Sequence, residues 1–221
     1  MTNNITFIVE TAGGKLRGAR YGSVHACKGI PYGGSVDGEH RFQPARKPES
    51  WTGVRDALDY GPSAPQPSGV VLNVSPKFTS LFEPAEPLPQ NENCLVLNCW
   101  TQGLADGRRR PVMVWLHGGA YQIGSGSSSW YDGTNLARDG DVVVVTLNHR
   151  LGSLGYLHLA GFGDERYAAS GNVGMLDIVM ALEWVRDNIT AFGGDPDNVT
   201  IFGESGGGGT VSYTHLRAHE T

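Results

Sequence analysis

The sequence feature that most restricts the fold is the apolar segment 141–148, which contains an uninterrupted run of valines at 142–145. A strand with one face in water alternates apolar and polar side chains, whereas a strand buried on both faces is continuously apolar. Segment 141–148 is therefore predicted to be a central strand covered on both sides. A chain achieves this by packing helices onto the two faces of a sheet.

Three further apolar segments, 94–100, 111–117 and 198–203, are also predicted to be strands. A helix is predicted before the last of them, because apolar residues recur there every three or four positions: Leu176, Val179, Leu182, Val185, Ile189 and Phe192. Glycines 193–194 are expected to end this helix, and Asp-Pro-Asp at 195–197 to turn the chain. Residues 134–139, closed by Gly140, form a shorter helical pattern. Strands that alternate with helices predict an α/β fold with a mostly parallel central sheet.

The first part of the chain has a different pattern of apolar residues. Residues 5–33 alternate apolar and polar side chains, which predicts short antiparallel strands with a turn at Gly13-Gly14. Residues 34–92 hold most of the prolines and little periodicity, and are predicted to be irregular with one short helix. A segment of this kind either walls a substrate gorge or only covers the surface.

The balance of charged residues argues against some classes of function. The chain has 17 Lys and Arg against 22 Asp and Glu, a formal net charge of −5, so it lacks the basic stripe with which proteins bind nucleic acid. No apolar run approaches the roughly 20 residues of a membrane helix. Residues 1–10 do not resemble a secretory signal. We expect a cytoplasmic protein with neither nucleic-acid nor membrane partners.

The three cysteines favour the same compartment. Cys94 and Cys99 lie in one predicted strand about 16 Å apart, which is too far for a disulfide. The sequence leaves open a pairing of Cys27 with either of them. An odd number of cysteines without a C-x-x-C motif favours free thiols in a reducing environment.

The most informative segment reads Gly-Glu-Ser-Gly-Gly at 203–207 and directly follows a predicted strand. It contains Gly-x-Ser-x-Gly, in which the serine sits in a strained turn at the carboxyl edge of a sheet. The flanking glycines let neighbouring backbone pass without a Cβ clash. Ser205 is therefore the candidate nucleophile and the Gly206 amide a candidate oxyanion donor. An ordinary Gly/Ser turn is the alternative.

A second motif, His-Gly-Gly-Ala-Tyr at 117–121, follows the predicted strand 111–117. Glycines at a strand end leave backbone N–H groups open to a ligand, as in the oxyanion loops of lipases and esterases. A tight glycine-rich turn is the alternative for this motif alone. Two such motifs in this order, each after a strand, favour catalysis over coincidence.

With these motifs in place, residues 5–210 resemble the type-B carboxylesterases of the α/β-hydrolase superfamily. The resemblance is carried by segments 27–32, 92–98, 114–120, 148–152 and 192–196 together with the serine motif. It implies an acyl-enzyme on Ser205 and a small-molecule carboxylic ester as substrate, with neither metal nor organic cofactor. It also implies an oxyanion hole made by the backbone N–H groups of Gly119, Ala120 and Gly206.

Two features depart from the family pattern. Gly206 stands where alanine is usual, and the glycines at 206–209 disfavour a helix start by about 1 kcal/mol each relative to alanine. The region that would supply a disulfide partner for Cys94 reads Gly-Pro-Ser-Ala-Pro at 61–65. This favours a free Cys94 and a bacterial-like enzyme.

The catalytic triad of the superfamily runs Ser, then Asp or Glu, then His along the chain. The titratable candidates after Ser205 do not follow this order: they are His215, His219 and Glu220. His117 and His149 are expected to be structural. We therefore expect the triad acid and histidine to be absent from this chain, with 1–210 being part of a longer hydrolase domain that is inactive alone. Residues 211–221 lack an apolar stripe and resemble translated adapter DNA, which predicts a non-native tail.

Two functions fit these patterns. The first is a serine carboxylesterase. The alternative is a non-catalytic adhesion or binding module on the same fold, of the kind that the resemblance also implies. The presence of Ser205 and of the upstream glycine motif favours the enzyme.

Overall fold

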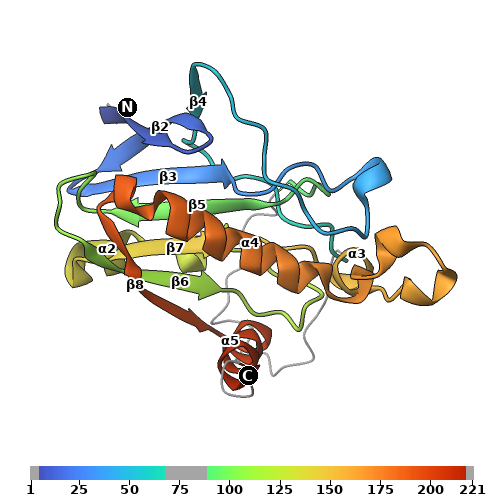
Figure 1. The fold of residues 1–221 in the computed structure, drawn as a ribbon. Coiled ribbons are helices and arrows are strands. Elements are labelled where there is room, and N and C mark those ends of the chain that lie inside the picture. Colours follow the sequence, from blue (N-terminus) through green and yellow to red (C-terminus); the bar gives the residue numbers. More distant parts are fainter. Residues whose placement is uncertain (1–4, 68–88, 218–221) are drawn as a thin grey trace.

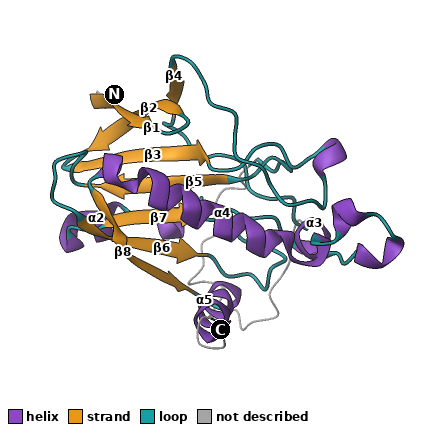
Figure 2. Ribbon diagram, in the orientation of Figure 1, coloured by secondary structure: helices purple, strands orange, loops and turns teal. Residues whose placement is uncertain are grey.

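A computed structural model describes residues 5–67 and 89–217, with side chains in the last helix as far as residue 212. The strands form one eight-stranded sheet in the order β1-β2-β3-β5-β7-β6-β8, with β4 paired to β2 (Figures 1 and 2). The strands are β1 (Ile5–Thr11), β2 (Gly14–Tyr21), β3 (Val24–Pro31), β4 (Val54–Asp56), β5 (Val96–Thr101), β6 (Arg110–Leu116), β7 (Val143–Leu147) and β8 (Gly194–Gly203). The α-helices are α2 (Thr134–Gly140), α3 (Gly152–Tyr156), α4 (Val173–Asn188) and α5 (Gly206–Arg217). Turns of 3₁₀ helix occur at Gly38–His40, Ser129–Tyr131, Ala160–Phe162, Glu165–Tyr167, Ser170–Asn172 and Ile189–Phe192.

The predicted α/β architecture is confirmed, but the sheet is mixed where a mostly parallel one was predicted. β6 pairs in parallel with β7 and β8, whereas β5 runs antiparallel to both β3 and β7. The connection from β5 to β6, residues 102–109, contains no helix. A parallel crossover needs about a dozen residues or more. This short connection therefore forces β5 and β6 to run in opposite directions.

The carboxyl ends of β6, β7 and β8 meet at one edge of the sheet. Figure 1 shows their arrowheads on the side of the molecule where α3 and α5 lie, with α4 crossing in front of the sheet. α2 connects β6 to β7 and α4 connects β7 to β8, so both parallel connections carry a helix. The segments that follow the three strands are therefore neighbours in space.

β7 is the doubly buried strand that the valine run predicts. Every residue of β7 is buried. Val143, Val145 and Leu147 belong to the main hydrophobic core, while Val144 belongs to a second cluster with Trp100. Because adjacent side chains in a strand point to opposite faces, the prediction of burial on both sides is confirmed.

The buried face of α4 differs from the predicted apolar stripe. Val179, a predicted member, is 49% exposed, whereas Asp177, Ile178 and Ala181 are buried. The apolar pattern does not predict this face correctly, because the charged residue Asp177 occupies a core position as the partner of Arg150. A charged side chain can be buried in this way only when it is paired. The last predicted members, at 189 and 192, lie in the 3₁₀ turn that follows α4.

Three predicted strand starts are displaced by two residues or more. β8 begins at Gly194, so the Asp-Pro-Asp at 195–197 lies inside the strand and not before it. The pairing with β6 shifts register between Arg110 and Val112, which accommodates the extra residues as an irregularity of the bulge type. β5 begins at Val96 and β7 at Val143, each two residues after the predicted start.

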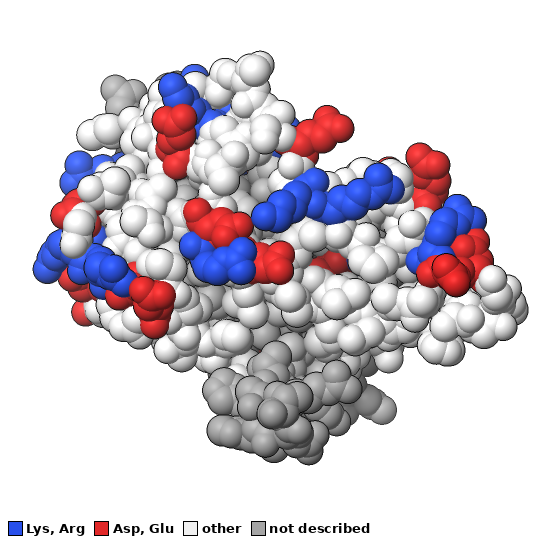
Figure 3. All heavy atoms as spheres, viewed as in Figure 1, with Lys and Arg blue, Asp and Glu red and all other residues white. Residues whose placement is uncertain are grey.

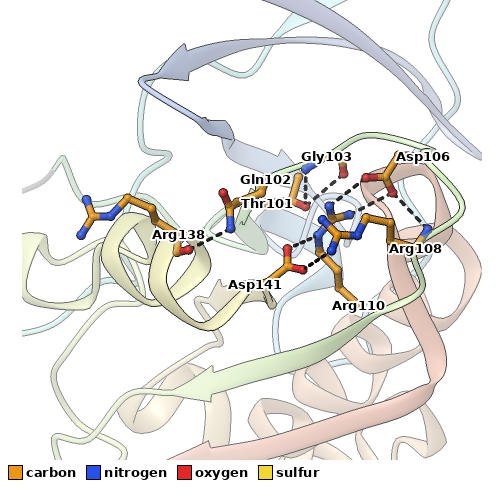
Figure 4. A network of polar contacts seen from close by, with 8 residues as sticks. All are labelled: Thr101, Gln102, Gly103, Asp106, Arg108, Arg110, Arg138 and Asp141. Carbon is orange, nitrogen blue, oxygen red and sulfur yellow. Dashed lines mark hydrogen bonds and ion pairs between the residues drawn. The ribbon is translucent and has the colours of Figure 1, made fainter.

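A network around Arg110 closes the opposite end of the parallel strands (Figure 4). Asp141, and not Gly140, takes the left-handed conformation after α2, with φ of 47°. Its carboxylate accepts a hydrogen bond from Arg110 Nε at 2.7 Å, and Asp106 binds the same guanidinium at 2.8 and 2.9 Å. The hydrogen bond to Arg110 is the main reason that the pKa of Asp106 is lowered to about 2. The network ties the β5–β6 connection to the end of α2.

The N-terminal strands follow the prediction. β1, β2 and β3 pair antiparallel, but Gly14 is already paired with Thr11, so the turn lies at 12–13, one residue before the predicted Gly13-Gly14. Cys27 and Cys99 face each other across β3 and β5. Both are nevertheless buried free thiols, as is Cys94. The expected free thiols are confirmed, and the pairing of Cys27 that the sequence left open does not occur.

The described part of segment 34–92 is irregular, as predicted. It contains one 3₁₀ turn, the short strand β4 and a bridge between Ser63 and Gln90; residues 68–88 lie outside the described part. Basic and acidic side chains are mixed over the face in Figure 3. No helix in the described ranges combines the length and hydropathy that a membrane span requires. α5 crosses the predicted boundary between 1–210 and 211–221, and this division stays a prediction.

Candidate active site

Ser205 lies in the tight turn between β8 and α5, residues 203–207, which we call the serine turn. Its φ is 51°, the left-handed conformation that non-glycine residues rarely adopt. The residue is exposed, and within the described part of the chain its hydroxyl has no hydrogen-bond partner. The strained turn that the motif predicts is confirmed, while the role of Ser205 as nucleophile stays a prediction.

The backbone of β6 explains the glycines on either side of Ser205. A Cβ at Gly203 would lie 2.7 Å from the carbonyl oxygen of Leu116, and a Cβ at Gly207 would overlap that same oxygen. Any larger residue would push the serine turn away from β6, because packed interiors leave no room for an added methyl group. The predicted close approach of neighbouring backbone is confirmed.

The segment after β6, residues 118–121, forms what we call the glycine loop. Gly119, Ala120 and Tyr121 have successive positive φ values of 108°, 52° and 60°. The Gly119 carbonyl accepts hydrogen bonds from the N–H groups of Gln122 and Ile123 at 3.0 and 3.1 Å, which closes a tight turn. The N–H groups of Gly119 and Ala120 donate to no acceptor among the described residues.

The glycine loop and the serine turn meet at Gly206. A Cβ built on Gly206 would lie 3.3 Å from the Ala120 nitrogen and 3.6 Å from the Tyr121 nitrogen. The Tyr121 hydroxyl donates a hydrogen bond to the Gly206 carbonyl oxygen at 2.8 Å. The N–H of Gly206 also has no acceptor within the described ranges. The structure therefore brings the predicted site residues to one edge of the sheet: Gly119, Ala120, Ser205 and Gly206.

Two buried histidines pack at the same edge. The rings of His117 and His149 stack with centroids 4.9 Å apart. Their Nδ1 atoms lie 2.7 and 3.0 Å from the carbonyl oxygens of Gly118 and Arg150. Because a carbonyl only accepts, each Nδ1 carries a proton. Burial lowers the pKa of His117 to about 3 and that of His149 to about 4.

These pKa values keep both imidazoles neutral near pH 7, and neither ring hydrogen-bonds Ser205. Both histidines thus have the structural placement that the sequence predicts. In the part of the chain that is described, no group of three or more His, Cys, Asp or Glu side chains is placed to hold a metal ion.

A buried ion pair holds the segment after β7. Arg150 Nε and a terminal nitrogen contact the two carboxylate oxygens of Asp177 at 2.8 and 2.6 Å, and the Arg150 N–H adds a bond of 3.0 Å. Burial raises the pKa of Asp177, and the bonds from Arg150 oppose that rise. The N–H of Gly152 donates to the Tyr121 carbonyl at 2.7 Å. The ion pair and the glycine loop are therefore connected through one short turn.

An open groove of about 800 Å³ lies beside the glycine loop. The described residues that line it carry no charge: Pro65, Gln66, Pro67, Ala120, Tyr121, Gln122, Leu151, Gly152, Ser153, Leu154 and Tyr156. Mostly apolar walls with a few polar groups are typical of small-molecule sites. The segment 34–92 contributes to this groove through residues 65–67.

Sequence reasoning missed the side chains that hold the glycine loop and the segment 122–126 directly after it. The amide of Gln66 exchanges two hydrogen bonds with the backbone of Gly124, at 2.8 and 3.0 Å. The Asn148 side-chain oxygen accepts from the Gly126 N–H at 2.8 Å. The Tyr121 hydroxyl reaches the serine turn. The family resemblance of segment 148–152 was a signal for Asn148, whereas nothing in the local sequence marks Gln66.

Comparison with known proteins agrees with this geometry. A model of the carboxylesterase family matches residues 6–221. Para-nitrobenzyl esterase of Bacillus subtilis (strain 168) is 47% identical over 205 residues, covering 93% of this chain and 39% of that protein. Neuroligin-2 of Mus musculus is 39% identical over 246 residues, covering 96% of this chain and 28% of that protein.

The fold is also shared with a solved structure. The crystal structure of a Geobacillus stearothermophilus carboxylesterase superposes with a TM-score of 0.81 at 49% identity, covering 92% of this chain and 38% of that one. This chain thus spans less than half the length of the relatives that it matches. The family model nevertheless extends over nearly all of it. The chain belongs to the carboxylesterase family, the type-B carboxylesterases of the α/β-hydrolase superfamily.

Proposed function

We propose that the full-length protein is a serine hydrolase that cleaves carboxylic esters through an acyl-enzyme on Ser205. The observation that carries this proposal is the meeting of Ala120 and Gly206, whose N–H groups have no acceptor among the described residues, beside an exposed serine in a strained turn. The relative named para-nitrobenzyl esterase, 47% identical, supports ester hydrolysis.

The reaction begins when Ser205 Oγ attacks the ester carbonyl carbon and gives its proton to a histidine. The carbonyl oxygen becomes negative and accepts hydrogen bonds from the N–H groups of Gly119, Ala120 and Gly206. A donor of this kind typically stabilises the transition state by about 3 to 4 kcal/mol. We place the triad histidine and acid in the part of the full-length protein outside this chain, and accordingly expect the 221-residue chain alone to be inactive.

The intermediate then collapses and the alcohol leaves with the proton that the histidine held. Water, deprotonated by the same histidine, attacks the acyl carbon on Ser205. The tetrahedral intermediate again places its negative oxygen on the three N–H groups. Its collapse releases the carboxylic acid and returns the proton to Ser205, with no metal or organic cofactor.

The lining of the groove supports a preference for neutral substrates. A charged group of a substrate that entered the groove would lose contact with water. It would meet no opposite charge among the described lining residues. We therefore propose that the acyl or alcohol group beside Ala120 is aliphatic or aromatic. A direct comparison is kcat/KM for p-nitrophenyl butyrate and for the p-nitrophenyl monoester of succinic acid, and we expect the butyrate to be the better substrate.

The nucleophile is tested in the full-length protein. Ser205→Ala should lower kcat for p-nitrophenyl butyrate by at least about a thousandfold. It should also abolish covalent labelling by a fluorophosphonate probe. Ser35→Ala, at an exposed serine outside the site, is the matched control and should keep both. A Ser205→Ala variant with substantial activity would contradict the proposal.

The alternative is a non-catalytic binding module on the same fold. It is favoured by one observation, which is that neuroligin-2, a relative not named as an enzyme, is 39% identical. The same labelling experiment separates the two functions. Folded full-length protein that neither reacts with the probe nor hydrolyses any ester of a broad panel would favour the binding module.

A further inference from the structure

Tyr121 connects the glycine loop to the serine turn through its side chain. Its hydroxyl donates to the carbonyl oxygen of Gly206 at 2.8 Å, across a separation of 85 residues in sequence. Its own carbonyl accepts from the N–H of Gly152 at 2.7 Å. Tyr121 is therefore held at its backbone by the segment after β7 and at its side chain by the serine turn.

The backbone of the glycine loop needs such restraint. Ala120 and Tyr121 both carry a Cβ and both have left-handed φ values, 52° and 60°. This conformation is costly for such residues and persists only where surrounding contacts impose it. Freed of those contacts, the loop would gain by moving Ala120 to an ordinary conformation, which would redirect the Ala120 N–H.

The Tyr121 hydroxyl bond spans the gap between two oxyanion donors that belong to different segments. Ala120 directly precedes Tyr121, and Gly206 is the residue whose carbonyl the hydroxyl binds. A Cβ at Gly206 would lie 3.3 Å from the Ala120 nitrogen, so the two donor residues are neighbours. One side-chain hydrogen bond thereby connects the two donor residues across the gap.

We propose that the Tyr121 hydroxyl is a positioning group that holds the N–H groups of Ala120 and Gly206 in the arrangement that binds the developing oxyanion. This inference rests on the proposed function and adds a residue to it. Tyr121 does not touch the reacting atoms; it acts through the two donor residues.

We expect removal of this hydroxyl to leave the fold intact. The Gly206 carbonyl also accepts a hydrogen bond from the Thr210 hydroxyl at 3.2 Å, so it keeps a partner. The Tyr121 ring packs against Tyr156 with centroids 5.5 Å apart, and phenylalanine preserves that contact. Tyr121→Phe therefore removes the bond to Gly206 and, with it, a longer contact of 3.5 Å in which the Thr210 hydroxyl donates to the Tyr121 hydroxyl.

The test is steady-state kinetics of full-length Tyr121→Phe with p-nitrophenyl butyrate. We expect kcat to fall about three- to tenfold, the effect of one hydrogen bond, with KM and the melting temperature nearly unchanged. The affinity for an aryl trifluoromethyl ketone should fall by the same factor as kcat/KM, because its adduct with Ser205 places a negative oxygen on the same donors.

Two controls isolate the hydroxyl. Tyr60→Phe removes a tyrosine hydroxyl that is bonded elsewhere, to Asp132 at 3.2 Å, and should keep wild-type kcat. Incorporation of 3-fluorotyrosine at position 121 keeps the hydroxyl and should keep most of the activity. The fluorotyrosine variant also remains informative if the phenylalanine variant folds poorly.

The outcomes separate this inference from the proposed function. If Ser205→Ala is inactive while Tyr121→Phe keeps both wild-type kcat and wild-type affinity for the ketone, the positioning role is overturned and the esterase proposal stands. A raised KM with unchanged kcat would likewise overturn it, because Tyr121 would then only line the groove. Activity that survives in Ser205→Ala would overturn both.

Discussion

The imidazole rings of His117 and His149 lie face to face, with centroids 4.9 Å apart and planes inclined by 14°. His117 directly follows β6, and His149 is the second residue after the end of β7, the neighbouring parallel strand. The stack therefore joins the starts of the two segments that build the site. It also places two ionisable groups in a buried environment where only their neutral forms are stable.

This stack predicts a loss of stability in mild acid. Histidines of the unfolded chain take up protons below a pH of about 6.5, whereas the folded pKa values are about 3 and about 4. The unfolded state then binds more protons, so the free energy of unfolding falls as the pH drops from about 6.5 towards 4. Each histidine contributes up to about 1.4 kcal/mol per pH unit.

Urea unfolding of the full-length protein between pH 7 and pH 5 measures this slope. His149→Phe keeps an aromatic ring in the stack and removes one titrating group. The dependence of the unfolding free energy on pH should therefore become less steep by about the contribution of one histidine. An unchanged slope in this variant would show that His149 is not the group responsible.

The buried ion pair of Arg150 and Asp177 predicts that a single substitution lowers the unfolding free energy more than the replacement of both residues. Asp177→Leu leaves the Arg150 guanidinium, 2% exposed, without its counter-charge, which should cost about 3 to 5 kcal/mol of unfolding free energy. The double variant Arg150→Met with Asp177→Leu should be less destabilised than the single one. Denaturant unfolding checks both values.

A surface pair is the matched control for this comparison. Arg17 and Asp56 are 2.7 Å apart, but their side chains are 42% and 59% exposed. Asp56→Asn should therefore change stability by no more than about 1 kcal/mol. Equal effects at Asp177 and Asp56 would contradict the importance of burial.

The serine turn predicts intolerance of a single methyl group. Gly207→Ala would place a Cβ onto the Leu116 carbonyl oxygen of β6, which should destabilise the protein by about 1 to 3 kcal/mol and displace Ser205. Gly161→Ala, where a Cβ would meet no atom within 4 Å, is the control. Loss of fluorophosphonate labelling in the first variant alone is the expected result, and equal labelling in both would refute the steric account.

The clamp between Gln66 and Gly124 predicts a local change in dynamics. Gln66→Ala removes both side-chain bonds to the Gly124 backbone, so amide hydrogens of residues 119–124 should exchange faster. Gln102→Ala, which removes a bond to the Arg138 carbonyl far along the chain, should leave that exchange unchanged. Exchange by mass spectrometry resolves the segment, and unaltered protection in Gln66→Ala would show that the clamp does not hold the loop.

The sequence predicts the close packing of the serine turn on β6 well because glycine marks it locally. Gly203 and Gly207 mark positions where β6 leaves no space for a side chain, and their spacing around Ser205 is readable without a fold. The direction of β5 was also accessible, since the connection 102–109 is too short for a parallel crossover.

Other features depend on partners that are distant in sequence. The stripe predicted for this helical segment was right at Val185, Ile189 and Phe192, which are core residues, and wrong at Val179, which is exposed. It also missed Asp177, which is buried as the partner of Arg150, 27 residues away. The bonds of Gln66 and Tyr121 span 58 and 85 residues. No local periodicity reports such pairings, so the residues that hold the glycine loop and the segment directly after it became visible only once the fold placed the segments together.

The central claim is that Ser205 faces the N–H groups of the glycine loop and of Gly206. A crystal structure of the full-length protein after reaction with a fluorophosphonate tests it most directly. We predict phosphorus bonded to Ser205 Oγ and one phosphoryl oxygen about 2.7 to 3.1 Å from the nitrogens of Gly119, Ala120 and Gly206. A label on another residue, or a phosphoryl oxygen turned away from these nitrogens, would contradict the account.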